Sequence, residues 1–258
     1  MGVELRLLGP MEARSGERAL PLGPRQQRLL LAVLAYEVNR VVTIDRLIEW
    51  LWPDEPPRRA THAVRVMVSK IRAQLPELEL ATRGSGYVLC ADPMTVDVHR
   101  FLALVEQSRE IRTDQRRVQV LDEALALWRG PVLADTVPAE TREQLFGGLA
   151  ESRLLAIEDR FDALLRLGRH REVLGDITVE ARAYPIRERL TGQLMLALVR
   201  NGQVGAALDA ARRIREHLAD ELGVDPGREL QELELAILRN EFTIRRGGYA
   251  RRFGLILC

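Results

Sequence analysis

The sequence predicts a mainly α-helical protein that opens with a small region of antiparallel strands and helices and continues as an all-α region. Leu, Ala, Arg and Glu dominate a chain in which only 5% of residues are aromatic, and this composition favours helices. Short alternating runs bounded by Gly and Pro indicate strands in the first part, whereas apolar residues recur at helical spacing afterwards. With 258 residues, the chain is long enough for two ordinary domains.

Three short antiparallel strands are expected at the start of the chain, because alternating segments are separated by Gly9 and Pro10 and by a turn around Gly16. They cover residues 3–8, 11–14 and 18–22. Two helices are expected next, at residues 25–40 and 43–52, with Thr43 as the N-cap of the second.

A third helix is expected at residues 58–75, and its two faces differ in chemistry. At 100° per residue, its predicted core positions are Ala60, Val64, Met67, Val68, Ile71 and Leu75. The opposite face carries Arg58, His62, Arg65, Ser69 and Arg72. No acidic residue occurs between Pro56 and Pro76, as a phosphate backbone would favour. A solvated helix with a chance run of arginines is the alternative for this stretch alone.

A β-hairpin is expected after this helix, with strands at residues 78–82 and 87–91 and a basic, Gly-bearing tip at residues 83–86. Three strands, three helices and a final hairpin form the layout of a winged helix-turn-helix, an α+β fold. In that layout the third helix enters the major groove and the wing touches the backbone or the minor groove.

The residues of this region also carry a resemblance to a known family. The segments that carry it are LLGPMEAR, PLGPRQQRLLLAVLAYEVNRVVTIDRLIEWLWPDEPPRRATHAVRVMVSKIR and TRGSGYVL. They resemble the DNA-binding domain of the Streptomyces antibiotic regulatory proteins, which is similar to the OmpR-type winged helix. The resemblance covers nearly all of residues 3–92.

The second region is expected to be helical throughout. Two amphipathic helices are predicted within residues 96–109 and 116–129, the second ending at Gly130 and Pro131, and a long one at residues 140–167. An internal repeat follows, in which Gly168 and Gly202, and likewise Leu174 and Leu208, are 34 residues apart. This is the tetratricopeptide period, so helix pairs with Gly in the turn are expected.

Residues 93–240 resemble the bacterial transcriptional activation domain that follows the winged helix in the same family, on EALALWRGPVLAD, EDRFDALLRLGRHREVL and the segment that starts at YPIRERL. We therefore expect a winged-helix domain at residues 1–92 and a tetratricopeptide-like activation domain at residues 93–242. Residues 243–258, with four arginines and no acidic residue, are expected to be a flexible basic tail.

The sequence lacks the motifs of common catalytic and metal sites. His62, His99, His170 and His217 are scattered, no HExxH, GxSxG or P-loop motif occurs, and the two cysteines have no metal-ligand spacing. No enzyme activity, metal or cofactor is therefore expected. The three tryptophans are expected to anchor helices rather than to stack on bases, since each ends an apolar helical pattern.

The charge and hydropathy of the sequence indicate the kind of partner and the compartment to expect. The net charge is only +1, but the first region is slightly basic and the second is acidic. No secretory signal or membrane-spanning segment is seen, so the sequence predicts a soluble, cytoplasmic protein without a membrane partner.

We expect a sequence-specific transcriptional activator, in which Arg65 and its neighbours read bases while Arg58, Arg59, Lys70, Arg72 and Arg83 hold phosphates. The predicted DNA-binding residues are Arg58, Arg59, Thr61, His62, Arg65, Val66, Ser69, Lys70, Arg72, Arg83, Ser85, Gly86 and Tyr87.

The family resemblance implies binding to direct repeats in promoters of antibiotic-biosynthesis genes. It also implies protomers side by side on the DNA, and recruitment of RNA polymerase through its sigma and alpha subunits. A tetratricopeptide adaptor whose winged helix binds protein is the alternative, and an enzyme is a distant third. The salt dependence of binding distinguishes the first two, because DNA binding through phosphates weakens steeply with salt.

Overall fold

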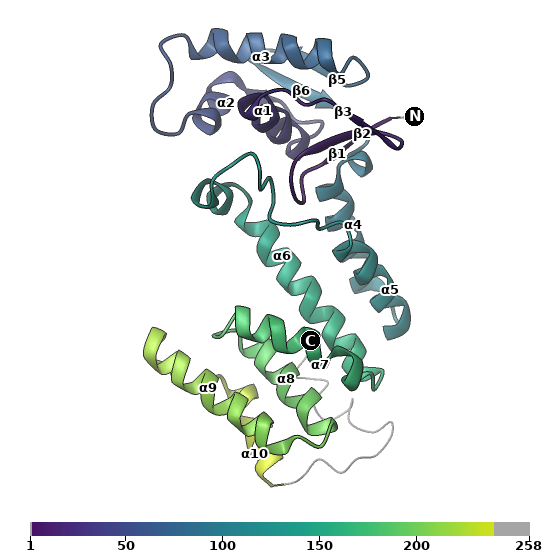
Figure 1. Ribbon diagram of the computed structural model, residues 1–258, viewed down its shortest axis with the longest axis vertical. Helices are drawn as coiled ribbons and strands as arrows, with labels where there is room; N and C mark the ends of the chain where they lie inside the picture. Colours follow the sequence, from purple (N-terminus) through teal and green to yellow (C-terminus); the bar gives the residue numbers. More distant parts are fainter. Residues whose placement is uncertain (1, 240–258) are drawn as a thin grey trace. The chain divides into compact units, whose positions relative to one another are not determined.

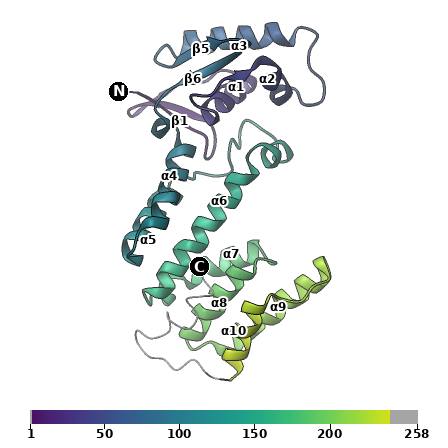
Figure 2. The same ribbon diagram turned by 180° about the vertical axis from the view of Figure 1, so that it is seen from behind.

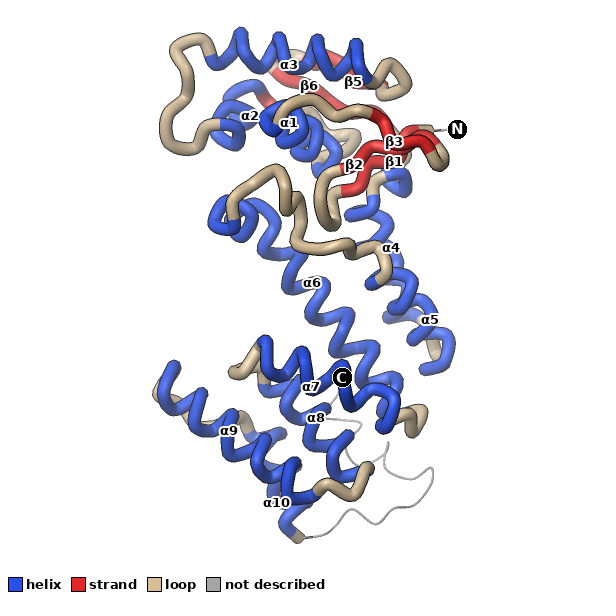
Figure 3. Tube along the Cα trace, in the orientation of Figure 1, coloured by secondary structure: helices blue, strands red, loops and turns tan. Residues whose placement is uncertain are grey.

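The computed structural model describes residues 2–239, which form two compact units. One unit, here the N-terminal unit, comprises residues 1–108 and 122–153, and the other, here the helical unit, comprises residues 109–121 and the chain from residue 154. Helices contribute most of the described residues, and strands occur only in the N-terminal unit (Figure 3). The predicted tail at residues 243–258 lies outside the described residues.

The N-terminal unit begins with the predicted three-stranded sheet. Strands β1 (Val3–Arg6), β2 (Glu12–Ser15) and β3 (Arg18–Leu20) are antiparallel in the order β1-β2-β3 (Figure 1). Val3 and Leu5 alternate along β1 and are buried, and Leu5 pairs with the buried Ala13 of β2. These three side chains therefore lie on one face of the sheet.

Three helices follow this sheet, as the apolar periodicity predicted: α1 (Arg25–Tyr36), α2 (Ile44–Leu51) and α3 (Ala60–Gln74). Thr43 is the N-cap of α2, and its hydroxyl accepts a hydrogen bond from the Arg46 amide at 3.3 Å. Helix α1 ends earlier than the predicted residue 40, because the chain turns at Asn39, which has a φ of 62°.

The wing is a second three-stranded sheet in the order β4-β6-β5. Strands β5 (Glu79–Arg83) and β6 (Gly86–Cys90) form the predicted hairpin, and β4 (Val42–Thr43), which was not predicted, pairs with the start of β6. A two-residue strand is too short to show an alternating pattern, and only its partner defines it.

After the wing, a 3-10 turn (η1, Pro93–Thr95) leads into α4 (Asp97–Glu110), and α5 (Asp114–Leu125) follows. The buried carboxylate of Asp97 accepts hydrogen bonds from the backbone amides of Leu7 at 2.7 Å and Leu8 at 3.0 Å. Phe101 of α4 packs edge to face on Trp128, with ring centroids 5.4 Å apart. The start of α4 is thereby attached to the segment that follows β1, and Trp128 is a helix anchor, as predicted.

Helix α6 (Ala139–Arg166) contributes residues to both units, and the helical unit continues with α7 (His170–Ala183), α8 (Glu188–Arg200), α9 (Val204–Leu222) and α10 (Arg228–Leu238). Figure 2 shows α7, α8 and α9 stacked in succession, and α8 packs against both neighbours. The predicted 34-residue repeat of helix pairs is therefore present in the structure.

The two predicted glycine turns have the same geometry. The φ angles of Gly168 and Gly202 are 76° and 77°, a left-handed conformation that favours Gly. The Gly168 amide donates to the Leu165 carbonyl and the Arg169 amide to the Leu164 carbonyl, and the equivalent bonds recur 34 residues later, at Gly202 and Gln203. Each is a Schellman turn that ends one helix and starts the next.

A buried ionic cluster joins α6 to α8. Glu158 is fully buried and accepts from Arg187 Nε at 2.9 Å, and Asp162 accepts from Arg189 at 2.5 Å and from Gln193. Burial raises the pKa of Asp162, whereas Arg189 acts in the opposite direction. Because removing one partner would leave an uncompensated buried charge, a substitution in this cluster is expected to destabilise the contact between α6 and α8.

No helix in the described part of the chain has both the length and the apolar character needed to cross a bilayer.

Candidate nucleic-acid interface

Helix α3 has one buried face and one exposed face, as its sequence predicted. The predicted core positions are all buried: Ala60, Val64, Met67, Val68, Ile71 and Leu75. The predicted polar positions are all exposed: Arg58, His62, Arg65, Ser69 and Arg72. Thr61, Lys70 and Val66 are exposed too, and 38% of the surface of Val66 remains accessible. The helix is thus held by α1 and α2 on one side and presents a basic surface on the other.

Five of the predicted DNA-binding cations have side chains without a hydrogen bond or an ion pair among the described residues. They are Arg58, Arg59, Arg65, Lys70 and Arg83. Most other arginines of the N-terminal unit are engaged, as in the ion pairs Arg46–Glu37 at 3.0 Å and Arg129–Glu12 at 2.7 Å. Arg18 is an exception. The unpartnered cations are therefore concentrated on α3, the turn before it and the wing.

The N-terminal end of α3 adds to this positive character. Arg58 and Arg59 lie in the turn that precedes the helix, which has no side-chain cap and no acidic residue in its first turn. Backbone amides at a helix N-terminus carry partial positive charge and bind anions such as phosphate.

A shallow hollow of about 520 Å³ lies beside this turn. It is lined by residues 56–62, Arg65 and Ile48. The sequence did not single out Ile48, Pro56 or Pro57 as part of the interface. The Pro56–Pro57 pair was a usable signal, because it bounds the turn that presents Arg58 and Arg59.

The wing ends in a two-residue turn at Gly84 and Ser85, between the paired residues Arg83 and Gly86. Gly84 has a φ of 54°, which explains a glycine in the turn. The side chains of Arg83 and Ser85 are exposed. The tip of the wing therefore presents one cation and one hydroxyl to a partner.

Arg72 connects the wing to α3. Its Nε donates to the Leu80 carbonyl at 2.8 Å, and a second guanidinium nitrogen donates to the Thr82 hydroxyl at 3.0 Å. The guanidinium also lies 5.9 Å from the centroid of the Tyr87 ring. As a result, α3 and the hairpin lie side by side in both ribbon views (Figures 1 and 2).

Two predicted DNA-binding residues, Gly86 and Tyr87, are buried in the wing sheet. A Cβ atom on Gly86 would lie 2.2 Å from the carbonyl oxygen of Val42 in β4, so this position admits no side chain unless the backbone moves. The structure therefore brings together the exposed candidates on α3 and at the wing tip, and it places Gly86 and Tyr87 beneath them. The direct contact with DNA stays a prediction for all of these residues.

Two family models match the chain in succession. The model described as "Transcriptional regulatory protein, C terminal" matches residues 17–89, and the model described as "Bacterial transcriptional activator domain" matches residues 96–238. The first match contains α1–α3 and all of the wing except Cys90, and the second contains α4–α10.

Two curated relatives are similar along almost the whole chain. The regulatory protein DnrI of Streptomyces peucetius is 32% identical over 264 residues, which cover 95% of this chain and 96% of that protein. The regulatory protein AfsR of Streptomyces griseus is 35% identical over 93% of this chain, but the chain spans only 25% of the length of that protein.

A solved structure has the same fold: Mycobacterium tuberculosis EmbR in complex with a low affinity phosphopeptide. It is 33% identical, its TM-score is 0.86, and the alignment covers 92% of this chain and 65% of that one. The matching proteins are transcriptional regulators and not enzymes. With both domain models in this order and a relative matched over nearly its full length, the chain belongs to the Streptomyces antibiotic regulatory protein family.

Proposed function

We propose that this protein is a sequence-specific DNA-binding transcriptional activator of genes for an antibiotic or another secondary metabolite. One observation carries the proposal: apart from Arg18, the cations of the N-terminal unit that have no partner among the described residues gather on α3, the turn before it and the wing tip. Cations without partners are available to replace the counterions of a phosphate backbone, and that exchange drives non-specific DNA affinity.

In this proposal α3 is the recognition helix. The exposed side chains of Arg65 and Val66 would face base edges, since arginine bonds bidentately to guanine and an apolar group suits the thymine methyl. Phosphates would be held from two directions, by Arg58 and Arg59 at the start of the helix and by Lys70 farther along it. Thr61, His62 and Ser69 lie on the same exposed face and would complete the contact.

The wing would contribute a separate contact with the backbone or the minor groove through Arg83 and Ser85. Arg72, Gly86 and Tyr87 would act indirectly, because their own interactions hold the hairpin against α3 and β4. The hydrogen bonds of Arg72 hold the wing hairpin against α3, and this supports a single docking geometry in which both contact the DNA.

Family membership is what supports the proposal for the target and the partners of this activator. We infer that it binds direct repeats in promoters in the cytoplasm, with protomers side by side, and that it recruits RNA polymerase through the sigma and alpha subunits. Direct repeats place protomers head to tail, with a spacing set by the helical turn of DNA. We further propose that residues 1–92 form the DNA-binding domain and residues 93–242 the activation domain.

Footprinting on the upstream regions of neighbouring genes tests this function. The expected result is protection of two or more similar sequences in the same orientation, with centres separated by whole turns of the duplex, each about 10 base pairs. Protection without sequence preference, or no protection at any protein concentration tested, would contradict the proposal. A chain that instead bound a protein through α3 would act as the tetratricopeptide adaptor.

A further inference from the structure

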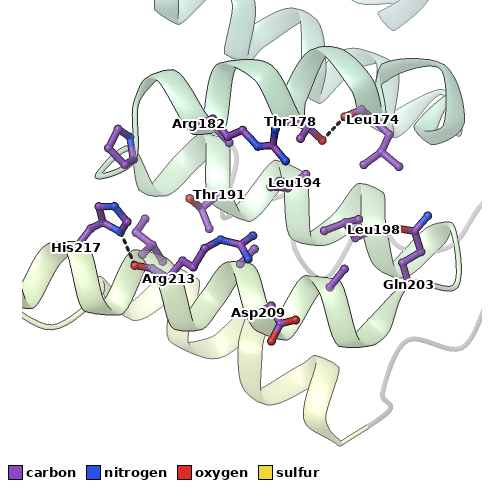
Figure 4. A pocket seen from close by; sticks show the side chains of 15 residues that line it. Leu174, Thr178, Arg182, Thr191, Leu194, Leu198, Gln203, Asp209, Arg213 and His217 are labelled. Atoms are coloured by element: carbon purple, nitrogen blue, oxygen red, sulfur yellow. Dashed lines mark hydrogen bonds between the residues drawn. The ribbon is translucent and has the colours of Figure 1, made fainter.

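The helical unit contains an apolar groove across α7, α8 and α9 that the proposed DNA contact does not use. Its volume is about 610 Å³ (Figure 4). Its floor includes Leu194 and Leu198 of α8 and Ala210 and Ile214 of α9, which are largely buried. Burial of one or two apolar side chains of a ligand on such a floor would supply favourable transfer free energy.

The rim of this groove is positively charged. Arg182 extends from α7 and Arg213 from α9 toward the space between these helices, with Leu194 of α8 between them (Figure 4). Both arginines are exposed, and neither side chain has an ion pair or a hydrogen bond among the described residues. Asp209 also lines the groove, but its ion pair is with Arg212, at 3.2 Å. The two rim cations are therefore available to a ligand.

His217 lines one end of the groove, one helical turn after Arg213. Its Nδ1 donates a hydrogen bond to the backbone carbonyl of Arg213 at 2.7 Å, so the other ring nitrogen is available to a ligand (Figure 4). Gln203, which follows the turn at Gly202, lines the opposite end. An amide side chain can both donate to and accept from the backbone of a bound segment.

These features differ from the rest of the helical unit, where arginines are commonly paired with carboxylates. Arg166 bonds Asp114 at 2.8 Å, and Arg189 bonds Asp159 at 2.6 Å. Unpaired arginines on both sides of an apolar floor make the groove complementary to a segment with apolar side chains flanked by carboxylates. The chain's own residues 243–258 do not fit this requirement, because they carry four arginines and no acidic residue.

We propose that the groove across α7, α8 and α9 docks a short acidic segment of a partner protein. The apolar side chains of this segment would contact Leu194, Leu198 and Ile214, while its carboxylates would pair with Arg182 and Arg213. The proposal concerns only the helical unit and does not depend on DNA binding, so either could fail without the other.

Selection from a random dodecapeptide library on the full chain, in the absence of DNA, tests this proposal. The expected result is enrichment of peptides that combine Asp or Glu with large apolar residues. Their affinity is expected to fall at least about tenfold in the double variant Arg182→Glu, Arg213→Glu, and to a smaller extent in Arg182→Gln, Arg213→Gln.

The matched control reverses two exposed arginines of the helical unit that do not line the groove, Arg112→Glu in the turn before α5 and Arg171→Glu on α7. It should retain the affinity of the unmodified chain, and thermal unfolding should show that all three double variants fold. No enrichment, enrichment of basic or uncharged peptides, or equal loss of affinity in the control variant would overturn the proposal. Saturation of the groove by a small acid rather than by peptides would also overturn it.

Discussion

Arg65 lies in the middle of the exposed face of α3 and makes no intramolecular bond among the described residues. Arg65→Ala is expected to cost roughly 1–3 kcal/mol of binding free energy at one base pair and to relax the sequence preference there. Competitive binding of a set of single-base operator variants measures this change. Arg18→Ala, which removes an exposed arginine of β3, serves as the control. Uniform weakening on all operators would instead make Arg65 a phosphate contact.

Asp97 is expected to matter for folding, because its buried carboxylate is the acceptor for two backbone amides in the segment that follows β1. Asp97→Ala leaves the Leu7 and Leu8 amides without it, at a cost of about 1–3 kcal/mol each in the free energy of unfolding. Chemical denaturation measures the loss, and Asp54→Ala in the exposed loop before α3 should leave stability nearly unchanged. Equal stability of the two variants would show that these two hydrogen bonds of Asp97 do not stabilise the fold.

The same carboxylate predicts a pH dependence. Burial raises the pKa of Asp97 above its usual value of 3.8, while the Leu7 and Leu8 amides and Arg129 act in the opposite direction. With a raised pKa, the Asp97 carboxyl binds its proton more tightly in the folded state than in the unfolded state. The protonated carboxyl therefore contributes to the free energy of unfolding. This contribution is fully present below the pKa of Asp97 in the unfolded chain and is lost as the pH rises through its pKa in the folded chain.

The free energy of unfolding of the unmodified chain should therefore fall relative to that of Asp97→Asn as the pH rises from about 4 to about 7. Denaturant titrations of both proteins across this range measure the difference, and other titrating groups cancel in the comparison. A constant difference, or one that grows in favour of the unmodified chain, would mean that the pKa of Asp97 is not raised.

Residue periodicity predicted α3 almost completely, because burial on one side of a helix requires apolar residues at a regular spacing. The role of Asp97 could not be predicted in this way, since its partners Leu7 and Leu8 are about ninety positions away in the chain. Gly86 and Tyr87 were grouped with the wing tip by their position in sequence, but the pairing with β4 places them inside the sheet.

At the scale of elements, the wing depends on the close approach of β6 to β4. Gly86→Ala would place a Cβ atom 2.2 Å from a backbone oxygen of Val42, which cannot move aside as a side chain could. We expect a loss of about 1–3 kcal/mol in the free energy of unfolding, and weaker DNA binding because Arg83 is displaced. Denaturation and fluorescence anisotropy measure both, with Ser85→Ala as the stability control. Unchanged stability of Gly86→Ala would show that the wing can detach from β4 at no cost.

The helix pairs of the second region were predictable for a related reason. A repeated supersecondary unit repeats its turn, so the 34-residue spacing of Gly168 and Gly202 indicates that both glycines end a helix in the same way. The groove across α7, α8 and α9 was not predictable, because its floor and its rim come from different repeats, and the sequence does not show which arginines remain unpaired.

At the scale of the whole molecule, the sequence already separated a slightly basic first region from an acidic second one, although the net charge is only +1. The structure adds which of the cations in the N-terminal unit are available to a partner. Among the described residues, most cations of the N-terminal unit have an ion pair, a hydrogen bond or a ring contact within the chain, and those that remain lie on α3, the turn before it and the wing tip, with Arg18 apart from them. This arrangement separates the proposed DNA contact from the proposed protein contacts of the helical unit.

The salt dependence of promoter affinity tests the central claim most directly. For the full chain, the logarithm of the association constant should fall linearly with the logarithm of salt concentration, with a slope of about −0.9 for each phosphate that the protein neutralises. The triple variant Arg58→Ala, Lys70→Ala, Arg83→Ala should have a shallower slope, by about 0.9 for each phosphate that it no longer neutralises, while Arg18→Ala keeps the slope of the unmodified chain. An affinity that is flat in salt, or a slope that the triple variant does not change, would contradict DNA binding through α3 and the wing.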